Sequence, residues 1–203
     1  MPEKRGKNTK KKIVSAAWRL FYEQGYENTT VDEIIEASGT SRGSFYHYFS
    51  GKDALLGSLS FMFDEKYEEL IPQMDPGMSA YDKLLFLNQE LFSMIEDTIS
   101  LDLLARMYST QLVTSGERHL LDHNRIYFRL IRRIAVEGQA RGELRSDISV
   151  NEITKLYALC ERALLYDWCL CSGEYSLVSY AAQTTPMFLE SYRGGHETGE
   201  KIF

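Results

Sequence analysis

Two short helical patterns separated by one glycine constrain the fold of this chain more than any other feature. Thr30-Val-Asp-Glu33 has the spacing of a capping box, in which a hydroxyl and a carboxylate satisfy each other's backbone amides at a helix start. Gly39 suits the left-handed stop of that helix. Ser41 is a good cap for the next helix, which reaches about Phe49. Two helices joined by so short a turn predict a helix-turn-helix.

An amphipathic segment precedes this pair. Ile13, Ala16, Ala17, Leu20 and Phe21 recur at helical spacing and form one apolar stripe. We expect Thr9 to cap this first helix and Gly25 to end it. Phe45 and Phe49, four residues apart, share the inward face of the third helix, so the three helices predict a small head with one apolar centre.

Helical spacing continues along the rest of the chain, and no strand alternation exceeds a few residues. We expect further helices at residues 52–70, 79–97, 100–114, 117–140, 149–171 and 176–192, with Pro186 kinking or breaking the last one. The predicted fold class is all-α: an N-terminal three-helix helix-turn-helix head plus a C-terminal helical-bundle body, about nine helices in total.

The charge is distributed unevenly. The whole chain carries a net charge of −6, but residues 1–52 hold nine Lys/Arg and six Asp/Glu, a net of +3, whereas residues 53–203 carry −9. A basic head on an acidic body favours a phosphate partner for the head alone. No apolar run is long enough for a membrane span. Three clustered cysteines, Cys160, Cys169 and Cys171, indicate reduced thiols and a cytoplasmic location.

The outward face of the third helix is small, polar and aromatic. On a helical wheel Gly43, Ser44 and His47 point away from the phenylalanines, with Arg42 and Tyr46 on one flank and Tyr48 on the other. A glycine inside a helix costs about 1 kcal/mol relative to alanine, so its missing side chain favours close approach to another backbone. Freed amides at such a helix start favour a phosphate.

The segment from Thr29 to Leu56, TTVDEIIEASGTSRGSFYHYFSGKDALL, closely resembles the DNA-binding head of TetR-family transcriptional regulators, and the resemblance covers about residues 9–60. It implies a three-helix head and an all-helical body that dimerises and often binds a small effector. It implies domains at 1–52 for DNA binding, joined by helix 52–70, and at 53–193 for effector binding and dimerisation, with a tail at 194–203. Ser50-Gly51 departs from the family, many members of which have a further basic residue there.

Carried over by position, the resemblance implies two sets of DNA contacts. Contacts to base edges or the groove fall on Arg42, Gly43, Ser44 and His47. Contacts to phosphate fall on Thr30, Ser41, Tyr46, Tyr48 and Lys52. The expected partner is double-stranded DNA with a near-palindromic site, bound by a homodimer, and the expected activity is repression relieved by an unknown small-molecule effector.

The segment 149–171 is apolar on two sides. One stripe is Ile153, Leu156, Tyr157, Cys160, Leu164 and Trp168, and the other is Leu159, Ala163, Tyr166 and Leu170. A helix of this kind is buried on both sides, and the resemblance implies that the second stripe forms the dimer interface. The alternative is a central helix in a monomeric bundle.

Polar residues inside apolar stripes are candidates for an effector site, because buried polar groups need partners. The candidates are Asn88, Tyr108, Gln111, Tyr127, Glu161 and Arg162. Alternatively, Asn88, Glu161 and Arg162 satisfy one another or face a subunit contact.

We expect no metal site, no cofactor and no enzymatic activity. His119 and His123 have a spacing that permits metal ligation, but no third ligand is evident. Two other interpretations stay open: a helical-bundle enzyme carrying such a head, and a protein-interaction module whose head has lost DNA binding. In the second case Arg42→Ala with His47→Ala would leave partner binding intact.

Overall fold

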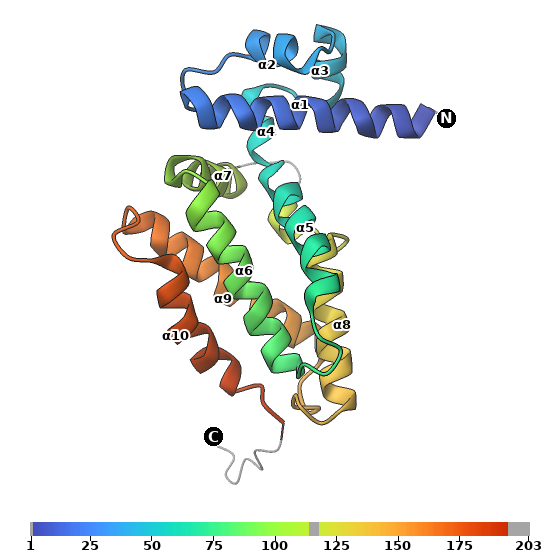
Figure 1. Cartoon of the computed structure of the whole chain (residues 1–203), viewed down its shortest axis with the longest axis vertical. Coiled ribbons are helices and arrows are strands. Elements are labelled where there is room, and N and C mark those ends of the chain that lie inside the picture. Colours follow the sequence, from blue (N-terminus) through green and yellow to red (C-terminus); the bar gives the residue numbers. More distant parts are fainter. Residues whose placement is uncertain (1, 114–117, 195–203) are drawn as a thin grey trace. The chain divides into compact units, whose positions relative to one another are not determined.

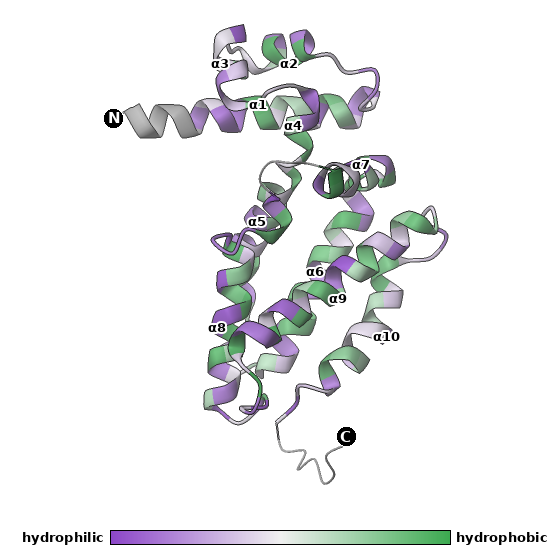
Figure 2. Cartoon of the chain, turned by 180° about the vertical axis from the view of Figure 1, so that it is seen from behind, coloured by the Kyte–Doolittle hydropathy of each residue, from purple (hydrophilic) through white to green (hydrophobic). Residues whose placement is uncertain are grey.

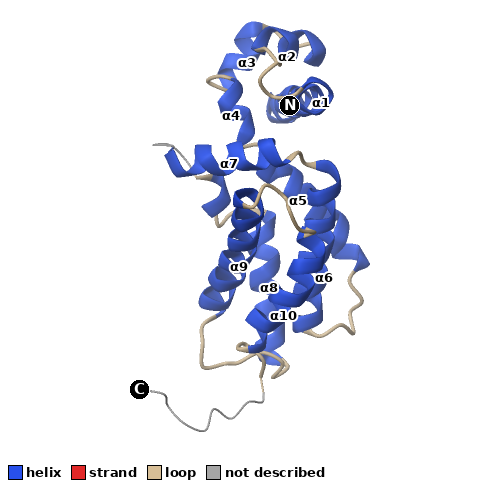
Figure 3. Ribbon diagram, turned by 90° about the vertical axis from the view of Figure 1, so that its left-hand side faces the viewer, coloured by secondary structure: helices blue, strands red, loops and turns tan. Residues whose placement is uncertain are grey.

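The computed structural model of the chain describes residues 2–113 and 118–194, with side chains described from Asn8 onward. Within these residues it contains ten α-helices, two short 3-10 helices and no strand (Figures 1 and 3), which confirms the all-α prediction. The α-helices are α1 Pro2–Gln24, α2 Val31–Ser38, α3 Arg42–Tyr48, α4 Lys52–Leu56, α5 Leu59–Leu70, α6 Ala80–Thr98, α7 Leu101–Val113, α8 Ile126–Ala140, α9 Val150–Leu170 and α10 Leu177–Glu190. The 3-10 helices are η1 Ile71–Gln73 and η2 His119–Leu121.

The expected helix at 52–70 is wrong in one respect, because it is interrupted between α4 and α5. Ser58 is buried at the interruption, where its hydroxyl accepts a hydrogen bond from Trp18 Nε1 at 2.8 Å and donates to the Leu55 carbonyl. A Cβ at Gly57 would lie 2.7 Å from His119, so the glycine permits a close approach of η2. The periodicity of 52–70 carries no sign of either contact.

Two helix starts and the effect of one proline also differ from expectation. α1 begins at Pro2, ahead of the cap expected at Thr9. The helix expected at 117–140 begins only at Ile126, and residues 114–117 lie outside the described chain. α10 continues through Pro186, so this proline does not break it. Of the tail expected at 194–203, residues 195–203 lie outside the described chain.

The chain forms two compact units. The head unit comprises residues up to Met62 together with Ile99–Leu120, and the body unit comprises Phe63–Thr98 together with residues from Leu121 onward. The head unit is therefore larger than the expected 1–52 domain, because it includes α7, which packs against α4.

The head unit has one apolar centre. Ile13 of α1, Ile34 of α2 and Phe45 of α3 are fully buried, as their spacing predicts. Tyr26 ties α7 to this centre, because its ring lies between Lys52 Nζ at 4.2 Å and the Arg106 guanidinium at 5.1 Å. Arg106 also forms an ion pair with Glu27 at 2.7 Å.

In the body unit α6 packs against α8 and α10, and α9 packs against the same two helices. Figure 2 shows hydrophobic residues along α6 and α10, and Leu84, Phe92 and Leu177 are fully buried. A Cβ at Gly138 of α8 would lie 2.5 Å from the Ala80 Cβ, so this glycine allows α8 to approach the start of α6. No helix within the described residues is long and apolar enough to cross a membrane.

Candidate functional site

The turn between α2 and α3 is fixed by local hydrogen bonds. Thr30 Oγ1 accepts from Glu33 N at 3.3 Å, and Glu33 Oε2 accepts from Thr30 N at 2.7 Å, which completes the predicted capping box. These bonds from Thr30 lower the pKa of Glu33. Gly39 has a φ of +61°, the left-handed stop that the sequence predicts, and Ser41 Oγ caps α3 by accepting from Ser44 N at 3.1 Å. The helix-turn-helix geometry therefore follows from its own residues.

The two faces of α3 differ as predicted. Phe45 is fully buried, and the adjacent Phe49 packs with it at 5.9 Å between ring centroids. The opposite face reaches solvent: Ser41, Arg42, Gly43, Tyr46 and His47 are exposed, and Ser44 and Tyr48 are half-buried. Since Phe45 and Phe49 anchor α3 in the apolar centre of the head unit, the polar face of α3 is held in a fixed orientation toward solvent.

Gly43 has no packing role inside the protein. A Cβ built on it would meet only Ser41 Oγ, at 3.9 Å, which is ordinary van der Waals contact. The space over Gly43 is thus open to a bound molecule, and the backbone of α3 is uncovered there.

Arg42 is not isolated on this face. Its guanidinium forms an ion pair with Asp32 of α2, and the two side chains are 64% and 70% exposed. The wheel of α3 alone shows no acid, so the sequence did not reveal this carboxylate. Exposed ion pairs are weak, so Arg42 can exchange Asp32 for another acceptor.

Lys52 is also engaged within the head unit. Its Nζ donates to the Tyr26 carbonyl at 2.7 Å and lies over the Tyr26 ring. The Tyr26 hydroxyl donates to Asp53, and burial raises the pKa of this tyrosine. Lys52 therefore has a structural role that the sequence did not indicate, whatever it contacts on a ligand.

Comparison with known proteins identifies the head. The family model described as bacterial regulatory proteins, tetR family, matches residues 13–59, which run from α1 to the start of α5 and include the helix-turn-helix. The head of this chain therefore matches the DNA-binding domain of TetR-family regulators. This match agrees with the resemblance of the helix-turn-helix to the heads of DNA-binding transcriptional regulators.

Three known proteins show how far the similarity extends. An uncharacterized HTH-type transcriptional regulator, YuxN of Bacillus subtilis, is 35% identical over 101 residues, which span 48% of this chain and 35% of that relative. The fatty acid metabolism regulator protein of Bacillus subtilis is 24% identical and aligns over 82% of this chain and 87% of its own length. The crystal structure of Thermus thermophilus FadR, a TetR-family repressor in complex with lauroyl-CoA, has a TM-score of 0.68 at 24% identity and covers 94% of this chain and 98% of that chain. The body thus also has a TetR-like fold.

Three of the predicted effector residues meet in the centre of the body unit. Glu161 of α9 is buried and accepts from Asn88 Nδ2 of α6 at 3.1 Å and from the Tyr127 hydroxyl of α8 at 2.6 Å. Thr185 of α10 donates to Asn88 Oδ1 at 3.0 Å, so the network joins four helices. Burial raises the pKa of Glu161, while its hydrogen bonds lower it.

The other predicted effector residues lie elsewhere. Tyr108 and Gln111 are on α7 in the head unit, where Gln111 Oε1 accepts from Leu120 N at 3.3 Å. Arg162 does not join the Glu161 network but lines a separate pocket between α8 and α9. Within the body unit, Asn88, Tyr127 and Glu161 are thus brought together by hydrogen bonds, and Arg162 faces the pocket.

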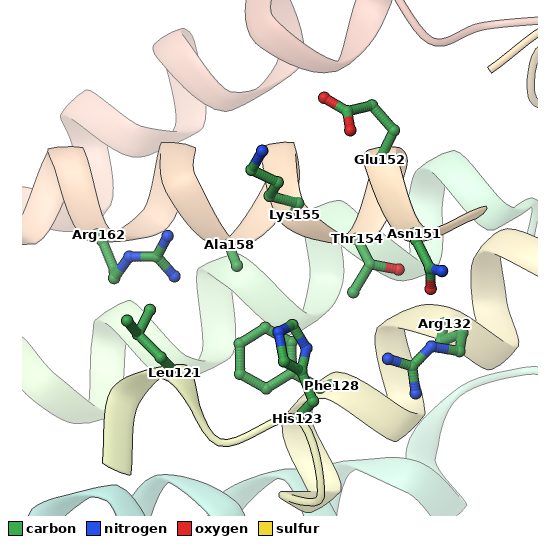
Figure 4. A pocket seen from close by; sticks show the side chains of 10 residues that line it. All are labelled: Leu121, His123, Phe128, Arg132, Asn151, Glu152, Thr154, Lys155, Ala158 and Arg162. Carbon is green, nitrogen blue, oxygen red and sulfur yellow. The ribbon is translucent and has the colours of Figure 1, made fainter. Parts of the chain in front are cut away.

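The pocket between α8 and α9 has a volume of about 490 Å³ (Figure 4). Its walls include Phe128 and Arg132 of α8, and Lys155, Ala158 and Arg162 of α9. Sequence reasoning singled out only Arg162 among them. The signal was the spacing of Lys155, Ala158 and Arg162, which places two cations and a small residue on one face of α9.

The two apolar stripes of α9 have different environments. Ile153, Tyr157 and Trp168 of the first stripe are buried in the body unit. In the second stripe Leu159, Tyr166 and Leu170 are 48%, 46% and 65% exposed, and Ala163 is exposed as well. A face of this kind is uncovered in the single chain.

The remaining candidate groups are the histidine pair and the cysteines. Within the described residues no group of three or more potential ligands is close enough to hold a metal ion. The spacing of His119 and His123 suits one helix face, but His119 lies in η2 and His123 lies in the loop before α8. Burial raises the pKa of Cys160 and of Cys169 to about 11, so both thiols are protonated near neutral pH.

Proposed function

We propose that this protein is a homodimeric repressor that places α3 of each subunit in successive major grooves of a near-palindromic operator. The observation that carries the proposal is the open face of α3, where the backbone is uncovered at Gly43 and no acid of α3 itself intrudes. Binding to chromosomal DNA would place the protein in the cytoplasm.

The DNA contacts that we propose follow the two predicted sets. Arg42, Gly43, Ser44 and His47 face base edges, and Thr30, Ser41, Tyr46, Tyr48 and Lys52 face phosphates. Asp32 competes for Arg42 in the free protein, so DNA binding requires that the guanidinium leave this carboxylate. Lys52 can keep its bond to the Tyr26 carbonyl and still offer a donor to phosphate, because an ammonium has three.

The dimer that we propose uses the exposed stripe of α9. Pairing Leu159, Ala163, Tyr166 and Leu170 with the same residues of a second chain would remove this apolar surface from water. A two-fold dimer would set the heads about one helical turn of DNA apart, roughly 34–36 Å. Tyr166→Glu with Leu170→Glu should therefore yield a monomer in analytical ultracentrifugation. Leu112→Glu, on the exposed part of α7, should leave the dimer intact.

The release mechanism that we propose acts through the body. FadR of Thermus thermophilus was crystallised with lauroyl-CoA, which supports a small-molecule effector for this chain. Such an effector would favour a body conformation in which the heads no longer fit the operator. A coupling of about 1–3 kcal/mol shifts affinity for DNA roughly 5–150-fold.

The direct test is operator binding. Duplexes selected from a random library by the full chain would be titrated by fluorescence anisotropy at several salt concentrations. We expect specific binding. The logarithm of the binding constant should fall linearly with the logarithm of the salt concentration, with a slope of about −0.9 for each phosphate contacted. Arg42→Ala with His47→Ala should abolish discrimination between operator and unrelated DNA, and Lys52→Ala should reduce the slope by about one. Absence of sequence preference would refute the proposal.

A further inference from the structure

We infer that the pocket between α8 and α9 binds an organic anion, with its phosphate or carboxylate held between Arg132 and Arg162 and its apolar part on Phe128 and Ala158. The inference that a ligand binds here is based on the geometry of the pocket. The inference that this ligand regulates DNA binding rests on the proposed function.

The two arginines come from facing helices. Figure 4 shows the guanidinium groups of Arg132 and Arg162 extending toward the middle of the pocket from opposite sides of the Phe128 and His123 rings. Lys155 lies one helical turn from Ala158 on the same side of α9. Two planar forks on opposite walls are suited to an anion with several oxygens, because each guanidinium can donate two parallel hydrogen bonds.

Within the described chain the side chains of Arg132, Lys155 and Arg162 make no hydrogen bond or ion pair, although the charge of Arg162 acts on the neighbouring Glu161. Glu152 is the one carboxylate among the residues that line this pocket. Other arginines of the same unit are paired: Arg125 with Asp64 at 2.9 Å, Arg141 with Glu143 at 2.8 Å and Arg145 with Asp147. Arg132 and Arg162 extend toward the same space and repel one another, and a bound anion would reduce that repulsion.

The pocket also has an apolar wall. Phe128 and Ala158 are buried at its base, and the His123 ring packs on Phe128 at 4.7 Å between centroids. A volume of about 490 Å³ suits a small organic molecule rather than a single inorganic ion. The ligand class is therefore an anion joined to an acyl chain or ring.

The test measures binding of three probes to the full-length protein by isothermal titration calorimetry. Lauroyl-CoA carries both phosphates and an acyl chain, dodecanoate carries the chain with a carboxylate, and coenzyme A carries the phosphates alone. We expect one of the two amphiphiles to bind at least about tenfold more tightly than coenzyme A. Whether lauroyl-CoA or dodecanoate binds more tightly identifies the source of the anion. Failure of both amphiphiles to bind would overturn the inference.

The variant Arg132→Gln with Arg162→Gln should weaken this binding at least about tenfold, since charge-assisted hydrogen bonds are among the stronger ones. The control is Arg129→Gln with Arg133→Gln, which removes the same charge from exposed positions of α8 outside the pocket. Equal binding by the two double variants would place the ligand elsewhere and overturn the assignment.

A second readout separates the site from the proposed function. Operator binding is measured without probe and then with saturating probe. A probe that binds through Arg132 and Arg162 but leaves the operator bound confirms the site and refutes its role in release. Loss of operator recognition without probe refutes the proposed function and leaves the calorimetric result standing.

Discussion

The polar side chains of α3 in the head unit and those around Glu161 in the body unit are held in opposite ways. On α3 they reach solvent, and their partners lie at most ten residues away, as in the pair of Arg42 with Asp32. In the body Glu161 is buried and takes its partners from residues 34 and 73 positions away. The comparison teaches that the α3 face of the head is left open to a ligand, whereas the buried carboxylate in the body is satisfied by residues of the body itself.

The largest effect is expected where the head depends on its apolar centre. Phe45→Ala removes a fully buried ring, which should lower the free energy of unfolding by about 3–5 kcal/mol. Urea denaturation followed by circular dichroism measures this. Tyr46→Ala, at the neighbouring exposed position, should change stability little, and equal losses would contradict the two-faced assignment of α3.

The body should respond next most strongly to loss of its buried carboxylate. Glu161→Ala strands the Asn88 amide and the Tyr127 hydroxyl, at a cost of about 2–4 kcal/mol. Glu161→Gln keeps an acceptor and should cost less. Glu68→Ala, at an exposed position of α5, serves as the control in the same denaturation series. No difference between Ala and Gln would show that the hydrogen bonds at Glu161 contribute nothing.

The same carboxylate predicts a pH dependence. Because burial raises the pKa of Glu161 in the folded state, the folded protein holds this proton more tightly than the unfolded chain. Stability contributed by the protonated form is therefore complete below the ordinary glutamate value of 4.5 and decreases as pH rises toward the folded-state pKa. Denaturation midpoints measured upward from pH 4.5 should fall less in Glu161→Gln than in the wild type. Parallel curves would contradict this account.

The features that could be predicted from the sequence are those that depend on local contacts, and the features that could not be predicted depend on long-range contacts. The caps at Thr30 and Ser41, the stop at Gly39 and the burial of Phe45 depend on residues within a few positions, so local spacing was enough. The pairing of Asn88 with Glu161 and the packing of α7 against α4 depend on long-range contacts that no periodicity records. The buried polar residues Asn88, Tyr127 and Glu161 were accordingly singled out from the sequence, but their hydrogen-bond partners could not be assigned.

Errors at the head have the same origin. The partner of Arg42 is Asp32 of α2, and the partner of Lys52 is Tyr26, which precedes α2. A helical wheel of α3 alone could not show either partner. The break between α4 and α5 likewise depends on Trp18 and His119, which are distant in sequence.

The smallest predicted effect concerns the competition for Arg42. Asp32→Asn removes the carboxylate that holds the guanidinium, so operator affinity should rise about two- to fivefold at low salt. Glu36→Gln removes the same charge from an exposed position of α2 and controls for the general reduction in negative charge. Anisotropy titrations that show equal gains for both variants would mean that the ion pair itself is irrelevant.

The open face at Gly43 is the central claim, and substitution there tests it most directly. Gly43→Ala and Gly43→Leu meet no protein atom closer than 3.9 Å at their Cβ, so the fold should be retained with urea midpoints no lower than that of the wild type. We predict that operator affinity, measured by anisotropy on the selected duplex, falls at least about tenfold for Ala and further for Leu, since closely fitting contacts tolerate little added volume. Wild-type affinity in a folded Gly43→Leu protein would show that α3 does not approach DNA by this face.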